Sequence, residues 1–292
     1  MRIAFLGLGL IGGSIARALR AADSNAAGEL RSATLVAWTP TGAGPKAALA
    51  AGAIDEVAPT LEAAVDGADL VILAAPPLRV LELLAALAAI GHTGLVTDVA
   101  STKAAIVARA SELHLRFVGG HPLAGRDTSG FEAADAGLFD GRPWAATTDD
   151  ASADDLDRVD ALAAACRAIP RRVTAADHDA AVAGISHLPL TLAAALVEAV
   201  AGRSVGGAPA AWPLAAELAA SGWRDMTRLA RGDAEMGSGI AATNAGPLAA
   251  GLRDVRAILD SWIEALERPG GPDAEALAAR LRDARARLVD DA

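Results

Sequence analysis

The sequence predicts an α/β domain built on a parallel sheet, followed by an all-helical domain. Up to about residue 174, short apolar runs alternate with helical segments, an order that produces parallel strands joined by right-handed crossover helices. Beyond Ala175 the chain consists of long Ala- and Leu-rich stretches without a further convincing strand. We therefore expect an N-terminal domain over residues 1–174 and a helical domain over residues 175–292.

Composition narrows the class of protein. The chain has 292 residues, 53% of them hydrophobic, and a net charge of −10 at pH 7. This charge disfavours a nucleic acid or an anionic membrane as partner, so an anionic substrate must be captured by local positive groups. Cys166 is the only cysteine, so we expect no disulfide framework and no metal site. We expect no apolar run to reach the roughly 18 residues needed to span a bilayer, and we expect a cytoplasmic enzyme.

The first strand is followed by a glycine-rich loop and a helix. Ile3 to Leu6 is a short apolar run, and Ser14 to Leu19 has helical character. The pattern Gly-x-Gly-x-x-Gly between them is informative because of these flanks, which disfavour a glycine turn without a ligand. It predicts a Rossmann dinucleotide-binding fold, with the pyrophosphate held at the helix N-terminus. The residues expected at the cofactor are Gly7, Leu8, Gly9, Leu10, Ile11 and Gly12.

The second strand, over residues 33–38, ends without the acidic residue that usually binds the ribose of NAD. Thr39 and Thr41 stand there instead and could bond a hydroxyl or a phosphate. No arginine lies beside them, and the nearest downstream cation is Lys46, which is equally well explained as a solvated helix residue. The sequence therefore leaves both NAD and NADP open as cofactor.

Further strands are expected over residues 69–74, 94–99 and 116–120, and two last ones over 143–148 and 169–174. Pro76, Ser101 and His121 each come just past the end of one of these strands. Ligands of parallel sheets bind at the carboxyl ends of the strands. We therefore expect Pro76 at the cofactor, and Ser101 and His121 as candidates for chemistry beside it.

Each polar candidate also has a purely structural explanation. His121 could be a general base near neutral pH or could simply pin its loop. Ser101 precedes a helical run, so it is predicted to be an N-cap, with or without a ligand contact. His187 could be a satisfied core histidine. Arg224 could lie on a solvated helix face or form a fork for a substrate carboxylate.

The helical half is predicted to contain five long helices, over residues 177–202, 210–220, 222–231, 240–266 and 273–289. Long apolar helices with little aromatic bulk often pack against a symmetry mate, so we expect a homodimer.

Several segments together resemble the prephenate/arogenate dehydrogenase family. They are GLGLIGGS from residue 7, DVASTK from residue 98, HPLAGRDTSG from residue 121, HD at residues 178–179, SHLP from residue 186 and WRDMTR from residue 223. They occur in order from Gly7 to about Asn244 and so cover most of the chain. The histidine–proline and SHLP segments are specific, whereas the glycine loop alone is not.

The resemblance implies a dimeric enzyme that oxidatively decarboxylates prephenate or arogenate on the route to tyrosine. In this family the residue matching His121 is the catalytic base, and the one matching Ser101 orients it and the substrate. Arg224 matches the arginine that binds the side-chain carboxylate, and Asp127 stands near it where many members have Glu. His187 belongs to the substrate site by the same resemblance.

Two positions depart from the family pattern. Leu190 stands where many members have a second histidine, and Gly237 where many have Trp. Both changes leave the exact substrate and inhibition by tyrosine open. The rivals are a β-hydroxyacid dehydrogenase and a dimeric cofactor-binding protein without turnover. The first needs a lysine on the helical domain, but Lys46 and Lys103, the only lysines, precede it.

Overall fold

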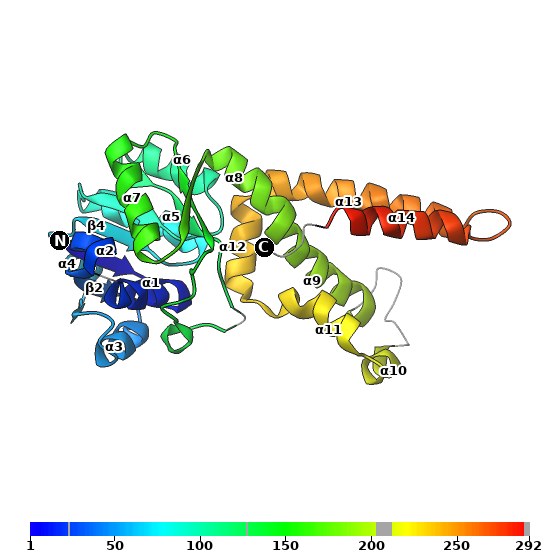
Figure 1. The fold of residues 1–292 in the computed structure, drawn as a ribbon, viewed down its shortest axis with the longest axis horizontal. Coiled ribbons are helices and arrows are strands. Elements are labelled where there is room, and N and C mark those ends of the chain that lie inside the picture. The colour runs from blue at the N-terminus through cyan, green and yellow to red at the C-terminus, as the bar shows by residue number, and fades with distance from the viewer. Residues whose placement is uncertain (23, 127, 203–211, 289–292) are drawn as a thin grey trace. The chain divides into compact units, whose positions relative to one another are not determined.

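The computed structural model describes residues 1–22, 24–126, 128–202 and 212–288. This part of the chain divides into two compact units, Met1–Ala245 and Gly246–Ala292. The first unit contains both sheets and the helices up to α12 (Figure 1). The expected boundary at residue 174 stays a prediction, since hydrogen bonds such as that from Lys103 N to Asp179 cross it within the first unit.

The main sheet has six parallel strands in the order β3-β2-β1-β4-β5-β6. The strands are β1 (Arg2–Leu6), β2 (Thr34–Trp38), β3 (Glu56–Val57), β4 (Leu70–Leu73), β5 (Leu95–Asp98) and β6 (Phe117–Val118). This order confirms the predicted Rossmann-type sheet, in which successive strands are added to one side of β1 up to β3 and to its other side from β4 onward. The crevice outside the carboxyl ends of β1 and β4 is therefore where this fold binds ligands.

Strand β1 is buried on both faces, as its uninterrupted apolar run predicts. Ile3 and Phe5 belong to the core on one face, and Ala4 and Leu6 to the core on the other. The first core is completed by side chains of α1 (Leu10–Ala21), α3 (Ala43–Ala50) and α7 (Ala153–Ala165). The second is completed by α4 (Leu61–Val65), α5 (Pro77–Ala89) and α6 (Ala104–Glu112). Two shorter helical elements of this part of the chain are α2 (Ser24–Arg31) and η1 (Phe131–Ala133).

A second sheet of three strands holds His121. Its strands are β7 (Gly120–Pro122), β8 (Pro143–Thr147) and β9 (Ile169–Val173), in that order. The single strand expected over residues 116–120 is therefore wrong: Val118 pairs with β5, whereas Gly120 pairs with β8. The glycines allow this change of sheet, because a Cβ on Gly120 would lie 2.5 Å from the Asp98 carbonyl oxygen. His121 accordingly lies inside a strand and not past its end.

The rest of the first unit is helical. Its elements are α8 (Ala175–Val182), η2 (Ala183–His187), α9 (Leu188–Ala201), α10 (Trp212–Glu217), α11 (Ser221–Thr227), η3 (Arg228–Arg231) and α12 (Ala234–Thr243). α8, η2 and α9 form one continuous helix, and η2 is a π-helical turn. Pro189, which has no N–H to donate, follows this turn directly.

The expectation that no segment could span a membrane is wrong by length and composition. The continuous helix Ala175–Ala201 has 27 residues and a mean hydropathy of 1.8, with 22% of its most apolar stretch buried. Sequence inspection missed it because His178, Asp179 and His187 interrupt the apolar run. All three are buried in a polar network of the first unit. We therefore interpret the helix as part of the folded unit.

The second unit is a pair of helices, α13 (Ala245–Leu266) and α14 (Ala274–Ala286). A single helix over residues 240–266 was expected, but it breaks at Asn244, which ends α12 with its side chain turned inward to Asp179 and His187. Arg280 joins the two helices by stacking 4.2 Å from the Trp262 ring centre and by hydrogen bonds to Ser261.

Candidate active site

The glycine loop has the geometry of a phosphate cradle. Gly7 has φ +106°, and a Cβ there would lie within 2.7 Å of the Ala74 carbonyl carbon and closer still to its oxygen. Gly12 lies against the loop, since its Cβ would be 2.8 Å from Gly7 O. Gly9 has open space at its Cβ position and starts α1, whose first turn has no side-chain cap and no acidic residue. Its N–H groups are therefore free to bind an anion.

The other residues predicted to bind the cofactor differ in burial and in hydrogen bonding. Leu8 is buried, so only its backbone could face a ligand, and Leu10 and Ile11 pack partly against the core. Pro76 is the N-cap residue of α5, directly after β4. Thr39 Oγ accepts a hydrogen bond from Gly42 N at 3.0 Å and so stabilises its own turn.

His121 stands at the end of a buried chain of hydrogen bonds. Its Nδ1 lies 2.8 Å from Nε2 of His178, and His178 Nδ1 lies 2.8 Å from Oδ1 of Asp179. The two rings meet edge to face, with centroids 5.1 Å apart. His121 itself is 9% exposed. The chain leaves Nε2 of His121 as the ring nitrogen without a partner among the described residues.

The surroundings of His121 keep it neutral. Burial is the main cause that holds the pKa of His121 well below 6.5, and electrostatic interactions with His178, Lys103 and His187 lower it further. Burial likewise lowers the pKa of His187, against the opposing charge of Asp179. A neutral imidazole has one unprotonated nitrogen and can serve as a base.

A buried ion pair fixes the backbone before His121. Asp98, the last residue of β5, and Lys103 are both fully buried and form a salt bridge. Burial raises the pKa of Asp98 and lowers that of Lys103, and each partner opposes the shift in the other. Asp98 also accepts hydrogen bonds from Gly120 N at 3.1 Å and Ala100 N at 2.9 Å. His121 is thereby tied to the carboxyl edge of the main sheet.

The prediction that Ser101 caps the next helix is wrong. Lys103 is the N-cap residue of α6, and the cap comes from Asp179, whose two carboxylate oxygens accept from Lys103 N at 2.7 Å and Ala104 N at 2.8 Å. Ser101 is half-buried, and its hydroxyl has no hydrogen-bond partner within the described part of the chain. It is therefore available to a ligand.

The remaining candidates are not all brought to His121. His187 is 1% exposed and belongs to the same network, because Asn244 Nδ2 donates to His187 Nδ1 at 3.0 Å and to Asp179 O at 2.8 Å. Arg224 is exposed on α11, and no described contact links it to the histidines. Asp127 lies outside the described residues.

The two positions that depart from the family pattern face each other. A Cβ on Gly237 of α12 would lie 3.8 Å from Leu190 Cδ2 of α9. The expectations from sequence give no role to Lys103, His178, Asp179 or Asn244, although two adjacent titratable residues in an apolar helix, such as His178 and Asp179, are a signal of a buried polar network.

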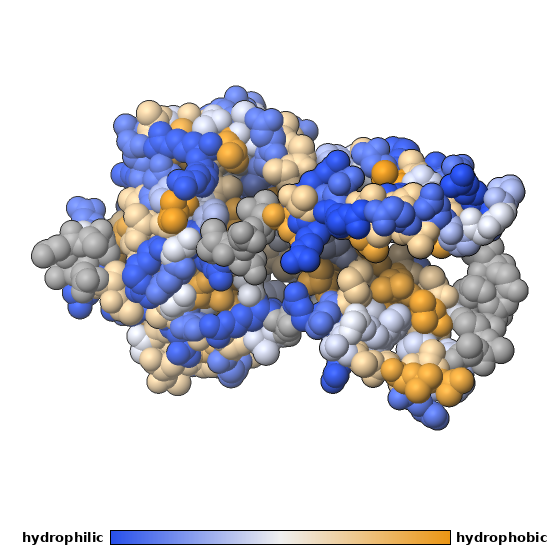
Figure 2. All heavy atoms as spheres, turned by 45° about the vertical axis from the view of Figure 1, so that its right-hand side comes forward, coloured by the Kyte–Doolittle hydropathy of each residue, from blue (hydrophilic) through white to orange (hydrophobic). Residues whose placement is uncertain are grey.

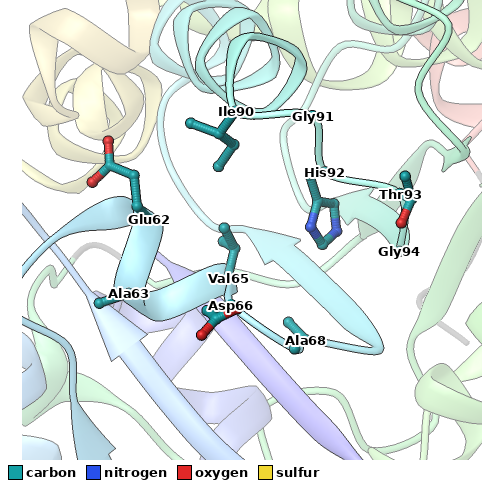
Figure 3. Close-up of a pocket in the computed structure, with 11 residues that line it drawn as sticks. Glu62, Ala63, Val65, Asp66, Ala68, Ile90, Gly91, His92, Thr93 and Gly94 are labelled. Atoms are coloured by element: carbon teal, nitrogen blue, oxygen red, sulfur yellow. The ribbon is translucent and has the colours of Figure 1, made fainter.

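One surface pocket lies away from this site. A pocket of about 540 Å³ is lined by residues before β4 and β5, among them Glu62, Asp66 and His92 (Figure 3). Ala68 and Gly94 in its wall directly precede these strands, so the pocket lies at the amino ends of the sheet. It is therefore distinct from the edge that carries the glycine loop and His121.

Two family models match the chain. A model described as prephenate dehydrogenase, nucleotide-binding domain, matches residues 31–171. A model described as prephenate dehydrogenase, dimerization domain, matches residues 174–283.

Known proteins resemble the chain along most of its length. A prephenate dehydrogenase of Bacillus subtilis is 35% identical over 237 residues, which cover 78% of this chain but only 60% of the relative. The crystal structure of Synechocystis arogenate dehydrogenase is 33% identical, with TM-score 0.77, and covers 99% of this chain and 100% of that one. A prephenate dehydrogenase from A. aeolicus, in complex with hydroxyphenyl propionate and NAD+, has TM-score 0.84 and 25% identity, with 98% and 97% covered.

Proposed function

The chain belongs to the prephenate dehydrogenase family, and from that premise we propose that it oxidatively decarboxylates prephenate or arogenate, with NAD+ or NADP+ as hydride acceptor. The product is 4-hydroxyphenylpyruvate from prephenate or tyrosine from arogenate, and the role is in tyrosine biosynthesis. The single observation that carries the proposal is the neutral, buried His121, whose Nε2 is free and whose backbone is tied to the carboxyl end of β5.

The glycine loop suits a dinucleotide. Gly9 leaves room for a pyrophosphate, and the uncapped first turn of α1 supplies N–H donors and a partial positive charge. A dinucleotide held there by Gly9 and the start of α1 would supply the acceptor for the hydride that leaves the ring carbon bearing the substrate hydroxyl. The choice between NAD+ and NADP+ rests on Thr39 and Thr41 just after β2 and on Lys46 in α3.

His121 moves one proton in the reaction. As the hydride leaves, the substrate O–H bond breaks and the proton binds to Nε2 of His121. Loss of CO₂ then makes the ring aromatic with a phenolate oxygen, to which the proton returns. Aromatisation supplies much of the driving force, so the residues need chiefly to orient the substrate and assist the proton transfer, a contribution of about 10² to 10⁴-fold.

The substrate is held by groups from two elements. Ser101, with its hydroxyl unpartnered, orients the substrate hydroxyl beside His121. Arg224 binds the side-chain carboxylate as a charged fork, which a chain of net charge −10 requires. Asp127 and His187 complete the substrate site in this proposal.

The active protein is proposed to be a cytoplasmic homodimer, with a nucleotide-binding domain over residues 1–174 and a dimerisation domain beyond. Support comes from apolar side chains that the described helices leave exposed: Ile185, Leu214, Leu218 and Met226 in the first unit and Ile258, Leu259 and Ile263 in the second. Figure 2 shows such side chains gathered over α10 and its surroundings, at lower right. Light scattering after size exclusion should give about twice the chain mass of 29.3 kDa.

The test of the reaction is an assay of the purified protein with prephenate and arogenate, each paired with NAD+ and NADP+. Formation of reduced cofactor together with CO₂ in at least one pairing is the expected result. No turnover in all four pairings would refute the proposed activity.

A further inference from the structure

The proposed reaction leaves His178 and Asp179 of α8 without a role, although both are buried and both connect to His121. His178 is 4% and Asp179 2% exposed. Residues of this polarity are seldom buried without a specific partner, because burial of an unpaired polar group is costly. Here each polar atom of the chain has a partner, from Asp179 through His178 to His121 Nδ1.

The direction of the hydrogen bonds follows from Asp179. Its carboxylate accepts from Lys103 N, Ala104 N and His178. Burial opposes ionisation, but the hydrogen bonds from His178, Ala104 and Lys103 outweigh it and lower the pKa of Asp179. An ionised carboxylate only accepts, so His178 Nδ1 must carry a hydrogen.

The tautomer of His121 then follows. A neutral His178 with its hydrogen on Nδ1 presents a lone pair at Nε2, which can only accept. His121 must therefore donate from Nδ1, which leaves its Nε2 unprotonated. A protonated His178 would reverse the last bond and place the hydrogen of His121 on Nε2, where it would block the base.

We propose that His178 and Asp179 are positioning residues that hold His121 in the Nδ1–H tautomer, so that Nε2 is the base. The catalytic effect of this tautomer rests on the proposed function, whereas the tautomer itself is a property of the free protein. The arrangement works like the carboxylate that orients a catalytic histidine in serine proteases, with a second imidazole inserted between the two groups.

The same chain stabilises the product of proton transfer. When the substrate O–H bond breaks and the Nε2–H bond forms, His121 becomes a cation. Lys103 and His187 oppose that charge, and Asp98 neutralises Lys103 through its salt bridge. The negative charge of Asp179 reaches His121 only through His178. We therefore expect the loss of His178 to affect kcat far more than KM.

Two variants separate this role from simple packing. His178→Leu removes the acceptor for His121 Nδ1–H while filling a similar volume. His178→Gln retains an amide oxygen that can accept the same hydrogen bond. His92→Gln is the matched control, because His92 lies in the pocket at the opposite edge of the sheet.

The experiment measures the ring nitrogens of ¹⁵N-labelled histidines by NMR at pH 7.5, with the His121 signals assigned by their loss in His121→Asn. We expect a single Nδ1–H tautomer of His121 in the unaltered protein, in His92→Gln and in His178→Gln, and a shift toward Nε2–H in His178→Leu. Steady-state kinetics should show kcat reduced by about 10² to 10³-fold in His178→Leu, with KM within threefold, and by less than tenfold in His178→Gln.

An Nε2–H tautomer of His121 in the unaltered protein overturns the proposal, and this result does not depend on any variant folding. So does a His178→Leu protein that retains the Nδ1–H tautomer and kcat within threefold. If the unaltered protein shows the Nδ1–H tautomer but turns over neither substrate, the proposed reaction fails while the hydrogen-bond assignment stands.

Discussion

Alanine at Gly7 should lower stability and alanine at Gly9 should weaken cofactor binding, because the two glycines have different surroundings. A Cβ on Gly7 would lie within 2.7 Å of the Ala74 carbonyl carbon, and φ at Gly7 is +106°. Backbone overlap of this kind costs about 1–3 kcal/mol, and the positive φ adds about 1–2 kcal/mol. Gly7→Ala should therefore lose about 2–5 kcal/mol of unfolding free energy, or about 5–15 °C in Tm for a unit of this size.

A Cβ on Gly9 meets nothing within 4 Å, so Gly9→Ala should leave Tm within about 2 °C. In the proposed cofactor site, the same methyl group would occupy the space through which the pyrophosphate approaches the α1 N–H groups. Loss of one hydrogen bond to a charged group costs about 1.5–3 kcal/mol, which weakens cofactor binding by about 10 to 150-fold.

The assay combines thermal unfolding with titration of NAD+ and NADP+ by calorimetry on the same preparations. Gly67→Ala is a control for positive φ without a clash, because its φ is +65° with open space around it. Unchanged cofactor affinity in Gly9→Ala would refute the assignment of the loop as the pyrophosphate site. A Gly7→Ala protein no less stable than Gly67→Ala would refute the steric argument.

Three further outcomes follow from the site. His121→Asn should lower kcat by about 10² to 10⁴-fold, measured by reduced-cofactor formation, and turnover within tenfold of the original would remove His121 as the base. Arg224→Ala should raise the KM for substrate about tenfold or more with kcat little changed, whereas an unchanged KM with both substrates would exclude Arg224 from the site. Burial and electrostatic interactions with neighbouring groups lower the pKa of His121, so His121 is protonated at a lower pH in the folded protein than in the unfolded chain. The contribution of neutral His121 to the free energy of unfolding is therefore complete above pH 6.5 and declines below it. For the same reason, kcat/KM should stay constant through neutral pH and fall only well below pH 6.5. An acid limb at or above pH 6.5 would contradict this environment.

Local patterns were sufficient for the nucleotide-binding fold. The apolar runs of β1, β2, β4 and β5 and the spacing of Gly7, Gly9 and Gly12 depend on neighbours in the chain, so periodicity and turn chemistry predict them. The resemblance to a known family then pointed to His121 as the base. The domain matches confirm the family, whereas the role of His121 stays a prediction. The assignments of Ser101, Arg224, His187 and Asp127 by the same resemblance also stay predictions.

Only the tertiary structure decided what surrounds the base. His121 and His178 are 57 positions apart, and Lys103 and Asp179 are 76 apart, so no local window contains either pair. Ser101 does not cap α6 because the carboxylate of Asp179, on the distant helix α8, accepts hydrogen bonds from the first N–H groups of α6. The expected helix over residues 240–266 is interrupted because Asn244 turns inward to the same network. Propensity describes a segment alone, whereas buried polar groups take whichever partner the fold brings within hydrogen-bonding distance. The sequence by itself determined the sheet, the glycine loop and the identity of the candidate base, whereas only the tertiary structure brought α8 to β7 and to the start of α6 and so decided the hydrogen bonds around that base.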